Sequence, residues 1–469
     1  MFIELKSDTI KGRLGGIGMK QNESGLNGIT EGVIWKQLLL FFFPILIGTF
    51  FQQLYNTIDA VIVGQYVGKE ALAAVGSTGS LINLLVGFFV GLSSGATVII
   101  AQYYGARDND NVSKAVHSSM ALSIVGGAII MMIGIIFAPT CLKAMGVPSD
   151  IMHYAVDYTR IYFIGMIASL IYNMGSGILR AIGDSKRPLY FLIISCIVNI
   201  VLDALFVIVF KMAVVGVGIA TVISQIISAI LTLVVLMKTS QSYKLYLRKI
   251  RFHKEILNRV ITIGLPAGLQ SVMYSISNII IQSNINSFGT DTIAAWAAYG
   301  KIDALFWMAM GAFGVSITTF VGQNFGAKKF DRVKKSVVVC LKMAMGVSIV
   351  LSVILFFFGG VFSQLFTNDI AVVNKSTEII RFLTPFYFTY VCVEILSGAI
   401  RGTGESLKPM ILTCFGICVL RVVWILFIVP LHPTFNMVTV SYPVTWAVTS
   451  ILFIIYYLKG NWLTKHMEE

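Results

Sequence analysis

Residues 177–188 read GILRAIGDSKRP, and residues 398–409 read GAIRGTGESLKP. The two stretches share an Arg, a Gly three residues later, an acid directly after that Gly and a final Pro, so that Arg180 matches Arg401 and Pro188 matches Pro409. A second pair of blocks recurs at the same offset along the chain, AQYYGAR at 101–107 and GQNFGAK at 322–328. Agreement of several blocks at one offset indicates that the chain is a duplicated unit.

Long apolar runs surround these blocks. Apolar residues, counted as AVILMFWYC, make up 57 % of the chain and charged residues 12 %, and the mean hydropathy is +0.83. Soluble domains carry about 25 % charged residues, and a helix needs about 20 apolar residues to cross the hydrocarbon core. We therefore predict an all-α polytopic membrane protein with twelve transmembrane helices. The predicted spans are 38–63, 71–101, 115–142, 154–179, 189–210, 212–237, 256–288, 292–321, 336–358, 379–400, 410–429 and 440–458.

The duplication divides the twelve spans into two six-helix halves. Six is even, so both halves enter the membrane from the same side, and we predict two parallel repeats, an N-lobe and a C-lobe, around a central cavity. The predicted organisation is a tail at 1–35, the N-lobe at 36–237, a basic linker at 238–255, the C-lobe at 256–460 and a second tail at 461–469. Met19 is a plausible start, and residues 1–18 are then an extension with no role in the fold.

The net charge of +13 could suggest nucleic acid. However, Lys and Arg gather in alternate loops, as at 238–259 and 328–335, whereas the loop at 430–436 has no charge. This pattern indicates a membrane topology with both termini cytoplasmic, and not a nucleic-acid partner. The six cysteines lie in or beside apolar runs, and no His or second Cys pair accompanies them, so we expect no metal centre.

Acidic side chains within spans are the best pointers to function, because each costs roughly 2.5–3.5 kcal/mol on insertion scales. Asp59 lies in the first span, and Asp203 lies in the fifth with Asn199 four residues earlier on the same helix face. Thr221 of the sixth span could face them. Such oxygen ligands suit a small hard cation, and two neighbouring carboxylates also suit a proton, because their repulsion favours protonation of one. The alternative is that each Asp satisfies a helix-packing hydrogen bond or faces a loop.

The second half lacks this set. The residue that matches Asp59 is approximately Asn278, and the residue that matches Asp203 is Trp424. The cation-binding chemistry is therefore predicted for the N-lobe alone.

Two further acids have open roles. Glu394 of the tenth span could meet a cationic substrate or a proton, or it could pair with Arg421 or Arg381. Asp303 stands two residues after Lys301, and we expect a local ion pair at the membrane interface.

The repeated loop blocks have structural or gating uses. In them we expect Gly to open a tight turn, Arg to anchor at the lipid headgroups and Pro to start the next helix. The candidate gating or structural residues are Pro44, Arg180, Gly183, Arg401 and Gly404.

With its twelve spans, duplicated halves and paired blocks, the chain resembles the multidrug and toxic compound extrusion (MATE) family over residues 30–463. The resemblance implies antiport of organic, mostly cationic and lipophilic, compounds against H⁺ or Na⁺ by alternating access. It implies a multi-pass protein, a monomer, of a bacterial or archaeal cytoplasmic membrane, with no cofactor and no enzymatic activity. Its partners are then small organic substrates and the lipid bilayer, with H⁺ or Na⁺ as the coupling ion.

The resemblance also assigns residues. Asp59, Asn199, Asp203 and Thr221 match the N-lobe cation site of the DinF-like prokaryotic branch, where Na⁺ is a possible ion. Other branches place an acid in the seventh helix, where this chain has Asn278 and Gln282, so a C-lobe cation site is not expected. The residues expected to contact substrate are Gln52, Tyr55, Asn173, Ser176, Asn278, Gln282 and Glu394.

The main alternative function is a lipid-linked oligosaccharide flippase of the same superfamily. Flippases usually carry more basic residues in the cavity, whereas the cavity helices here bear acids and few Arg. The duplicated lobes, with the predicted carboxylates in only one of them, argue against a channel or a receptor. An intramembrane enzyme is disfavoured because the spans carry no HExxH motif.

Overall fold

The computed structural model describes residues 29–463, and these form helices with no strand. Eleven helices are long and apolar enough to cross a membrane, and a bent pair makes a twelfth span, so the predicted fold class is confirmed. The N-lobe contains α2 (Ile34–Ile62), η3 (Val63–Val67), α3 (Lys69–Gly105), α4 (Asn109–Ala144), α5 (Met152–Ile164), α6 (Met166–Ala181), α7 (Lys186–Asp203), η4 (Ala204–Val209) and α8 (Ala213–Lys238). The C-lobe contains α9 (Lys254–Ile285), α10 (Thr290–Gly326), α11 (Phe330–Gln364), α12 (Ile370–Leu383), α13 (Tyr387–Gly402), α14 (Leu407–Thr413), η8 (Cys414–Val419), α15 (Leu420–Val423), η9 (Trp424–Ile428) and α16 (Phe435–Lys459). The suggested extension at residues 1–18 lies outside the described residues.

One span in each lobe is broken at the same place. In the N-lobe α5 and α6 meet at Gly165 with a bend of 49°. In the C-lobe the equivalent helices α12 and α13 are joined by a 3₁₀ turn that contains Pro385, whose ring cannot continue the helical hydrogen bonds.

The backbone repeats as the sequence does. Gly183 and Gly404 have φ of +98° and +96°, a left-handed conformation that favours glycine and turns the chain sharply after α6 and after α13. Arg107 and Lys328, which end the two matching AQYYGAR-type blocks, share φ of +58° and +57°. These two turns therefore have the same backbone conformation in both lobes.

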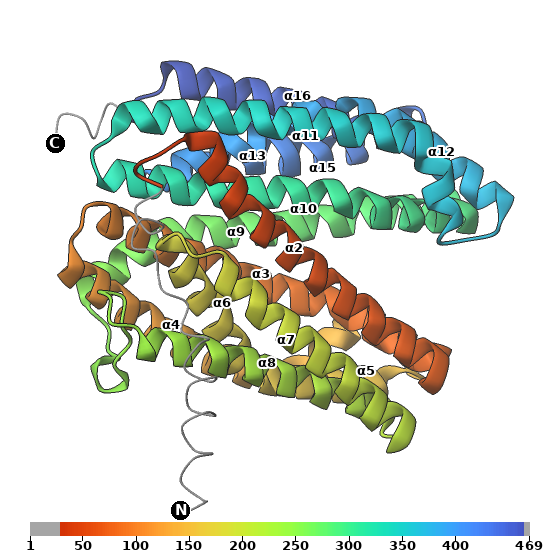
Figure 1. Cartoon of the computed structure of the whole chain (residues 1–469). Coiled ribbons are helices and arrows are strands. Elements are labelled where there is room, and N and C mark those ends of the chain that lie inside the picture. The colour runs from red at the N-terminus through yellow and green to blue at the C-terminus, as the bar shows by residue number, and fades with distance from the viewer. Residues whose placement is uncertain (1–28, 464–469) are drawn as a thin grey trace, which may run out of the picture.

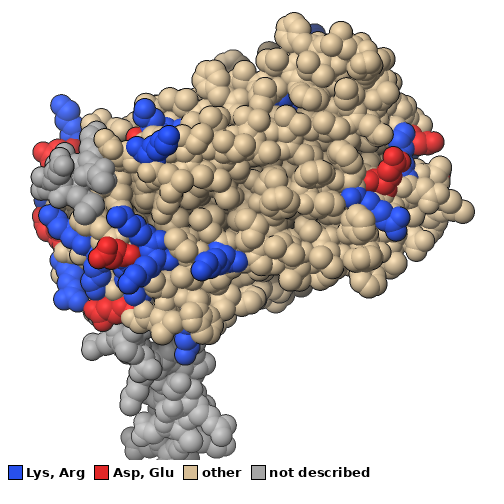
Figure 2. All heavy atoms as spheres, turned by 90° about the horizontal axis from the view of Figure 1, so that it is seen from above, with Lys and Arg blue, Asp and Glu red and all other residues tan. Residues whose placement is uncertain are grey.

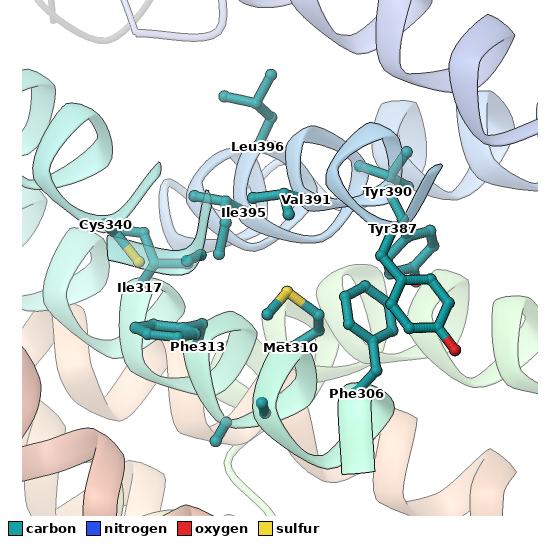
Figure 3. Close-up of a cluster of buried hydrophobic side chains, with 14 of the residues drawn as sticks. Phe306, Met310, Phe313, Ile317, Cys340, Tyr387, Tyr390, Val391, Ile395 and Leu396 are labelled. Atoms are coloured by element: carbon teal, nitrogen blue, oxygen red, sulfur yellow. The ribbon is translucent and has the colours of Figure 1, made fainter. Parts of the chain in front are cut away.

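The C-lobe core is built on α10 (Figure 3). Phe306, Phe313 and Ile317 of this helix are buried against α11 and α13. The Phe306 ring stacks on Tyr387, with centroids 4.1 Å apart. This packing makes α10 the helix around which the rest of the lobe is arranged.

Lys and Arg gather at one end of the molecule (Figure 2). This basic end contains the loops at 106–108, 182–185, 239–253, 327–329 and 403–406, and the described chain also begins and ends there (Figure 1). The two lobes meet at the basic end and diverge toward the other end (Figure 1).

The repeated sequence blocks join the lobes to each other. The Nε2 of Gln102, in the N-lobe, donates to the carbonyl oxygen of Gly402 at 3.0 Å. The Nε2 of Gln323, in the C-lobe, donates to the carbonyl oxygen of Ala181 at 2.6 Å. Each AQYYGAR-type block therefore docks on the GILRAIG-type block of the opposite lobe. We call these four residues the inter-lobe clasp.

Glycines beside the clasp allow the backbones of the two lobes to approach closely. A Cβ on Gly105 would collide with the carbonyl oxygen of Gln323, and a Cβ on Gly326 would collide with that of Gln102. Further along the interface, a Cβ on Gly91 of α3 would lie 2.5 Å from the backbone nitrogen of Gly268 of α9. Small residues are the usual means by which membrane helices pack backbone to backbone.

Helix α2 links the two lobes. Arg332 of the C-lobe donates to the carbonyl oxygens of Ile29, Glu31 and Gly32 at 2.7–3.1 Å. The helix then packs on α10 and α11 before it crosses to α7 of the N-lobe. Its start is thus held by the C-lobe, while its end belongs to the N-lobe (Figure 1).

The clasp predicts the effect of a single methyl group. Gly326→Ala places a Cβ against the Gln102 carbonyl oxygen, so we expect the lobes to separate at the basic end. Spin labels on Asn109→Cys and Lys335→Cys, in a cysteine-free background, should move apart. Gly346→Ala is the matched control, because its Cβ meets no atom within 4 Å. Equal label distances in Gly326→Ala and Gly346→Ala would contradict the role of the clasp.

Candidate functional site

Three helices of the N-lobe bring a polar cluster together. Asp59 lies in the last turn of α2, Asn199 and Asp203 lie at the end of α7, and Thr221 lies in α8. Helix α7 packs on both α2 and α8, and the four side chains are buried, with exposed fractions of 5 %, 1 %, 0 % and 1 %. Sequence analysis grouped these four residues, and in the structure Asp59 and Thr221 come from α2 and α8 to lie beside the α7 face that carries Asn199 and Asp203.

The cluster is polar, and by distance and angle most of its side-chain atoms have no hydrogen-bond partner within the part of the chain that the structure describes. No partner is found within residues 29–463 for Asp59 Oδ1, both carboxylate oxygens of Asp203, both amide atoms of Asn199 or Thr221 Oγ1. The two carboxyl groups lie close enough to interact, and the Thr221 hydroxyl lies beside Asp59. Buried polar groups in proteins are nearly always paired, so these unpaired atoms mark the cluster as a candidate site.

Both acids border irregular helix. Asp203 directly precedes the π-helical turn Ala204–Val209, and Asp59 lies four residues before the π-helical turn Val63–Val67. Such turns are rare and often occur at functional sites. Here they end the regular helix where the carboxylates lie.

A cavity of about 370 Å³ adjoins this cluster, lined mostly by N-lobe helices and on one side by α10 of the C-lobe. We call it the N-lobe cavity. Asn199 belongs to both, since it also lines the cavity. Of the residues expected to contact substrate, Gln52, Tyr55 and Asn173 line it as well. Ser176 is buried outside the lining, next to Tyr172.

A central cavity of about 470 Å³ lies between the lobes, and it corrects the expectation for two arginines. Arg180 and Arg401 were expected at the lipid headgroups, but both line this cavity. They stand in the last turns of α6 and α13. Arg401 Nη2 donates to Gln270 Oε1 at 3.3 Å and to Ser397 Oγ at 3.4 Å.

Glu394 lines the same central cavity. Its Oε2 accepts a hydrogen bond from the Tyr390 hydroxyl at 3.1 Å, and its carboxylate interacts electrostatically with Arg401. No ion pair joins it to Arg421 or Arg381 among the described residues. Glu394 is therefore a cavity residue that partly offsets the charge of Arg401.

The expectation for Asp303 was wrong. Asp303 makes no ion pair with Lys301 in the described part of the chain. It accepts hydrogen bonds from Trp307 Nε1 at 2.6 Å and from the Tyr387 hydroxyl at 2.5 Å. Lys301 is exposed, whereas Asp303, two residues later, faces the inside of the C-lobe.

A third cavity, also of about 470 Å³, surrounds Asp303 within the C-lobe. The predicted residues Asn278 and Gln282 line it, together with Arg421. Several aromatic side chains, which the sequence analysis did not predict as site residues, complete the lining. The available signal was the concentration of tryptophan in the second half, where Trp296, Trp307 and Trp446 occur.

Residues 29–463 contain no group of three or more His, Cys, Asp or Glu side chains that could hold a metal ion. Binding of a monovalent cation or a proton by the N-lobe cluster stays a prediction.

The two repeated lobes and their internal cavities define a membrane transporter. A sequence profile of the MatE family matches residues 44–205 and 266–426, once in each lobe. The chain therefore belongs to the MatE family, the multidrug and toxic compound extrusion transporters.

Individual relatives cover nearly the whole chain. It is 28 % identical over 445 residues to the probable multidrug resistance protein YoeA of Bacillus subtilis, covering 93 % of this chain and 96 % of the relative. It is 23 % identical over 396 residues to the multidrug export protein MepA of Staphylococcus aureus, covering 84 % and 87 %. A crystal structure of MATE in the bent conformation and an outward-facing MATE family transporter each share the fold, with a TM-score of 0.87 at 24 % identity. The first covers 95 % of this chain and 99 % of the solved one, and the second covers 94 % and 99 %.

The unpaired cluster predicts ion-dependent stability. A cation that binds only the folded protein should stabilise it by about 1.4 kcal/mol when its free concentration is ten times its Kd. We expect Na⁺, or mild acidification if the ion is a proton, to raise the apparent Tm of the purified protein. Asp203→Asn should abolish the increase, whereas Asp150→Asn, in an exposed turn, should keep it. An unchanged ion response in Asp203→Asn would rule out this cluster as the site.

Proposed function

We propose that this chain exports organic compounds from the cell in exchange for H⁺ or Na⁺. One observation carries the proposal: two acids, an amide and a hydroxyl are buried together without hydrogen-bond partners beside a cavity of about 370 Å³. A site for a small ion thus adjoins a site for a larger molecule. The names of the relatives, multidrug resistance and multidrug export proteins, support organic compounds as the cargo.

The cation acts through helix packing. An ion that binds Asp59 and Asp203 removes the repulsion between their carboxylates and draws the end of α2 toward α7 and α8. Because the C-lobe holds the start of α2, this movement also changes how the lobes meet. The basic end then opens as the clasp separates, and the cavities become accessible from the other side.

Cation and substrate share residues, which provides the coupling. Asn199 belongs to the ion cluster and also lines the N-lobe cavity. If the ion occupies Asn199, a substrate in the cavity loses that contact, so each ligand lowers the affinity for the other. The entry of one ion down a membrane potential supplies about 2.3 kcal/mol per 100 mV, which corresponds to roughly a 50-fold substrate gradient.

The orientation follows from the charges. We propose that the basic end, with both termini, faces the cytoplasm, because Lys and Arg are retained on that side of a membrane. The protein then lies in a bacterial or archaeal cytoplasmic membrane and acts as a monomer. Its basic residues serve topology, and nucleic acid is not a partner.

A second candidate is a flippase for anionic lipid-linked oligosaccharides. The observation that favours it is the presence of Arg180 and Arg401 in the central cavity, where a phosphate could bind. Glu394 in the same cavity and the two acids of the N-lobe favour cationic cargo instead. Phospholipid vesicles that contain a fluorescent polyprenyl diphosphate separate the two functions, since only a flippase moves this lipid between leaflets.

The proposed exchange predicts the loss of coupling in one variant. Asp59→Asn keeps the size of the side chain but removes its charge, so dye efflux from vesicles driven by a Na⁺ or an H⁺ gradient should fall to the level of empty vesicles. The two gradients are imposed separately, and the one that drives efflux in the unsubstituted protein identifies the ion. Asp150→Asn should transport normally. Normal efflux by well-expressed Asp59→Asn would refute the assignment.

A further inference from the structure

We propose that the C-lobe contains a separate binding site for amphoteric aromatic molecules, which carry a cationic and an anionic group on one aromatic body. The site lies between Asp303 of α10 and Arg421 of α15. It goes beyond the proposed exchange, because binding there requires no ion gradient and no residue of the N-lobe cluster.

The cavity around these residues has the size and the walls that such a ligand needs. Its volume of about 470 Å³ falls within the range of about 300–1,000 Å³ that holds drug-sized molecules. The ring centroids of Trp296 and Tyr442 are 5.5 Å apart, those of Tyr442 and Trp446 are 5.7 Å apart, and those of Trp307 and Tyr390 are 4.6 Å apart. These rings form a nearly continuous aromatic wall from α10, α13 and α16.

Asp303 supplies the negative charge. Both of its oxygens accept hydrogen bonds from uncharged donors, Tyr387 and Trp307. A carboxylate only accepts hydrogen bonds, whereas a protonated carboxyl would also donate one. The two donors therefore suit the ionised form, which leaves a charge without a cationic partner at the cavity.

Arg421 supplies the positive charge. Its exposed fraction is 4 %, and its guanidinium carbon lies 4.0 Å from the centroid of the Tyr442 ring. Nε and Nη2 donate to the Thr445 hydroxyl at 3.3 and 2.8 Å, and the hydrogen bonds of the described chain do not use Nη1. A planar guanidinium with a free edge suits a carboxylate or phosphate group.

The two charges share one cavity but do not pair. Within residues 29–463, the only ion pairs are Lys114–Asp110 and Arg187–Asp184, both in or near the loops of the basic end. A purely cationic ligand would satisfy Asp303 but face Arg421, and a purely anionic ligand would do the reverse. A molecule with both charges satisfies both side chains, so the site selects against ligands with a single charge.

The N-lobe has no copy of this site. In the alignment of the two repeats that pairs Arg180 with Arg401, Ile82 matches Asp303 and Ile200 matches Arg421. The charged pair thus belongs to the second copy alone, as the carboxylate cluster belongs to the first.

A matched pair of dyes tests the proposal. Rhodamine B is amphoteric, and its ethyl ester keeps the cation but loses the carboxylate charge. We expect the purified full-length protein to bind rhodamine B at least ~10-fold more tightly than the ester, measured by fluorescence anisotropy, since a fully paired charge is worth about 1.4 kcal/mol or more. Equal affinities for the two dyes in the unsubstituted protein would overturn the proposal without any variant.

Substitutions assign the two charges. Arg421→Gln should weaken rhodamine B alone and remove the preference, whereas Asp303→Asn should weaken both dyes. Arg381→Gln and Asp291→Asn, at exposed positions of α12 and α10, are the matched controls and should bind as the unsubstituted protein does. If Arg421→Gln does not fold, Arg421→Lys keeps the charge and should keep a preference for rhodamine B.

The outcome is separable from the proposed exchange. Asp59→Asn should retain the preference for rhodamine B even where it has lost transport. A preference that is unchanged in Arg421→Gln would overturn the assignment of the anion-binding side.

Discussion

Two amide-to-carbonyl hydrogen bonds determine where this transporter is closed. Gln102 and Gln323 each extend from one lobe to the turn of the other, at Gly402 and Ala181. Both side chains are buried, so each amide needs a partner within the protein, and the carbonyl oxygen of the opposite lobe is that partner. The pairing holds the basic end together, and the lobes diverge from there (Figure 1). The three cavities lie within or between lobes that are positioned by this contact.

Much of the fold follows from the sequence, but the side-chain environments do not. Apolar run lengths and the internal repeat predicted twelve spans in two lobes, because hydrocarbon thickness and duplication leave direct marks in a sequence. A helix can carry polar residues on several faces. The environment of each side chain then depends on neighbours that lie far away along the chain. Arg180 and Arg401 were therefore misplaced at the headgroups, and Asp303 was paired with the adjacent Lys301 although its partners lie on the inner face of α10 and on α13. The grouping of Asp59 with residues of α7 and α8 was suggested by resemblance and is present in the structure, while its role in ion binding stays a prediction.

The duplication supplied symmetry, and the two lobes then diverged in their chemistry. The turns at Gly183 and Gly404 and the clasp are equivalent in both copies, because both must form the same joint. The interior positions are not bound by that requirement. The N-lobe contains the unpaired carboxylates, and the C-lobe contains a cavity lined by aromatic side chains, so the interiors of the two lobes differ. Helix α2 is the physical link between them, since it starts on the C-lobe and ends at Asp59.

The central claim is that the coupling ion binds in the N-lobe alone. Ion binding by the purified protein tests it most directly. Bound Na⁺ is measured with radioactive sodium, and bound H⁺ is measured as the change in free protons that a pH indicator reports. The account predicts that the double variant Asp303→Asn with Glu394→Gln binds the ion with the stoichiometry of the unsubstituted protein, and that Asp59→Asn with Asp203→Asn binds none. Loss of ion binding in the C-lobe variant, or its retention in the N-lobe variant, would contradict the account.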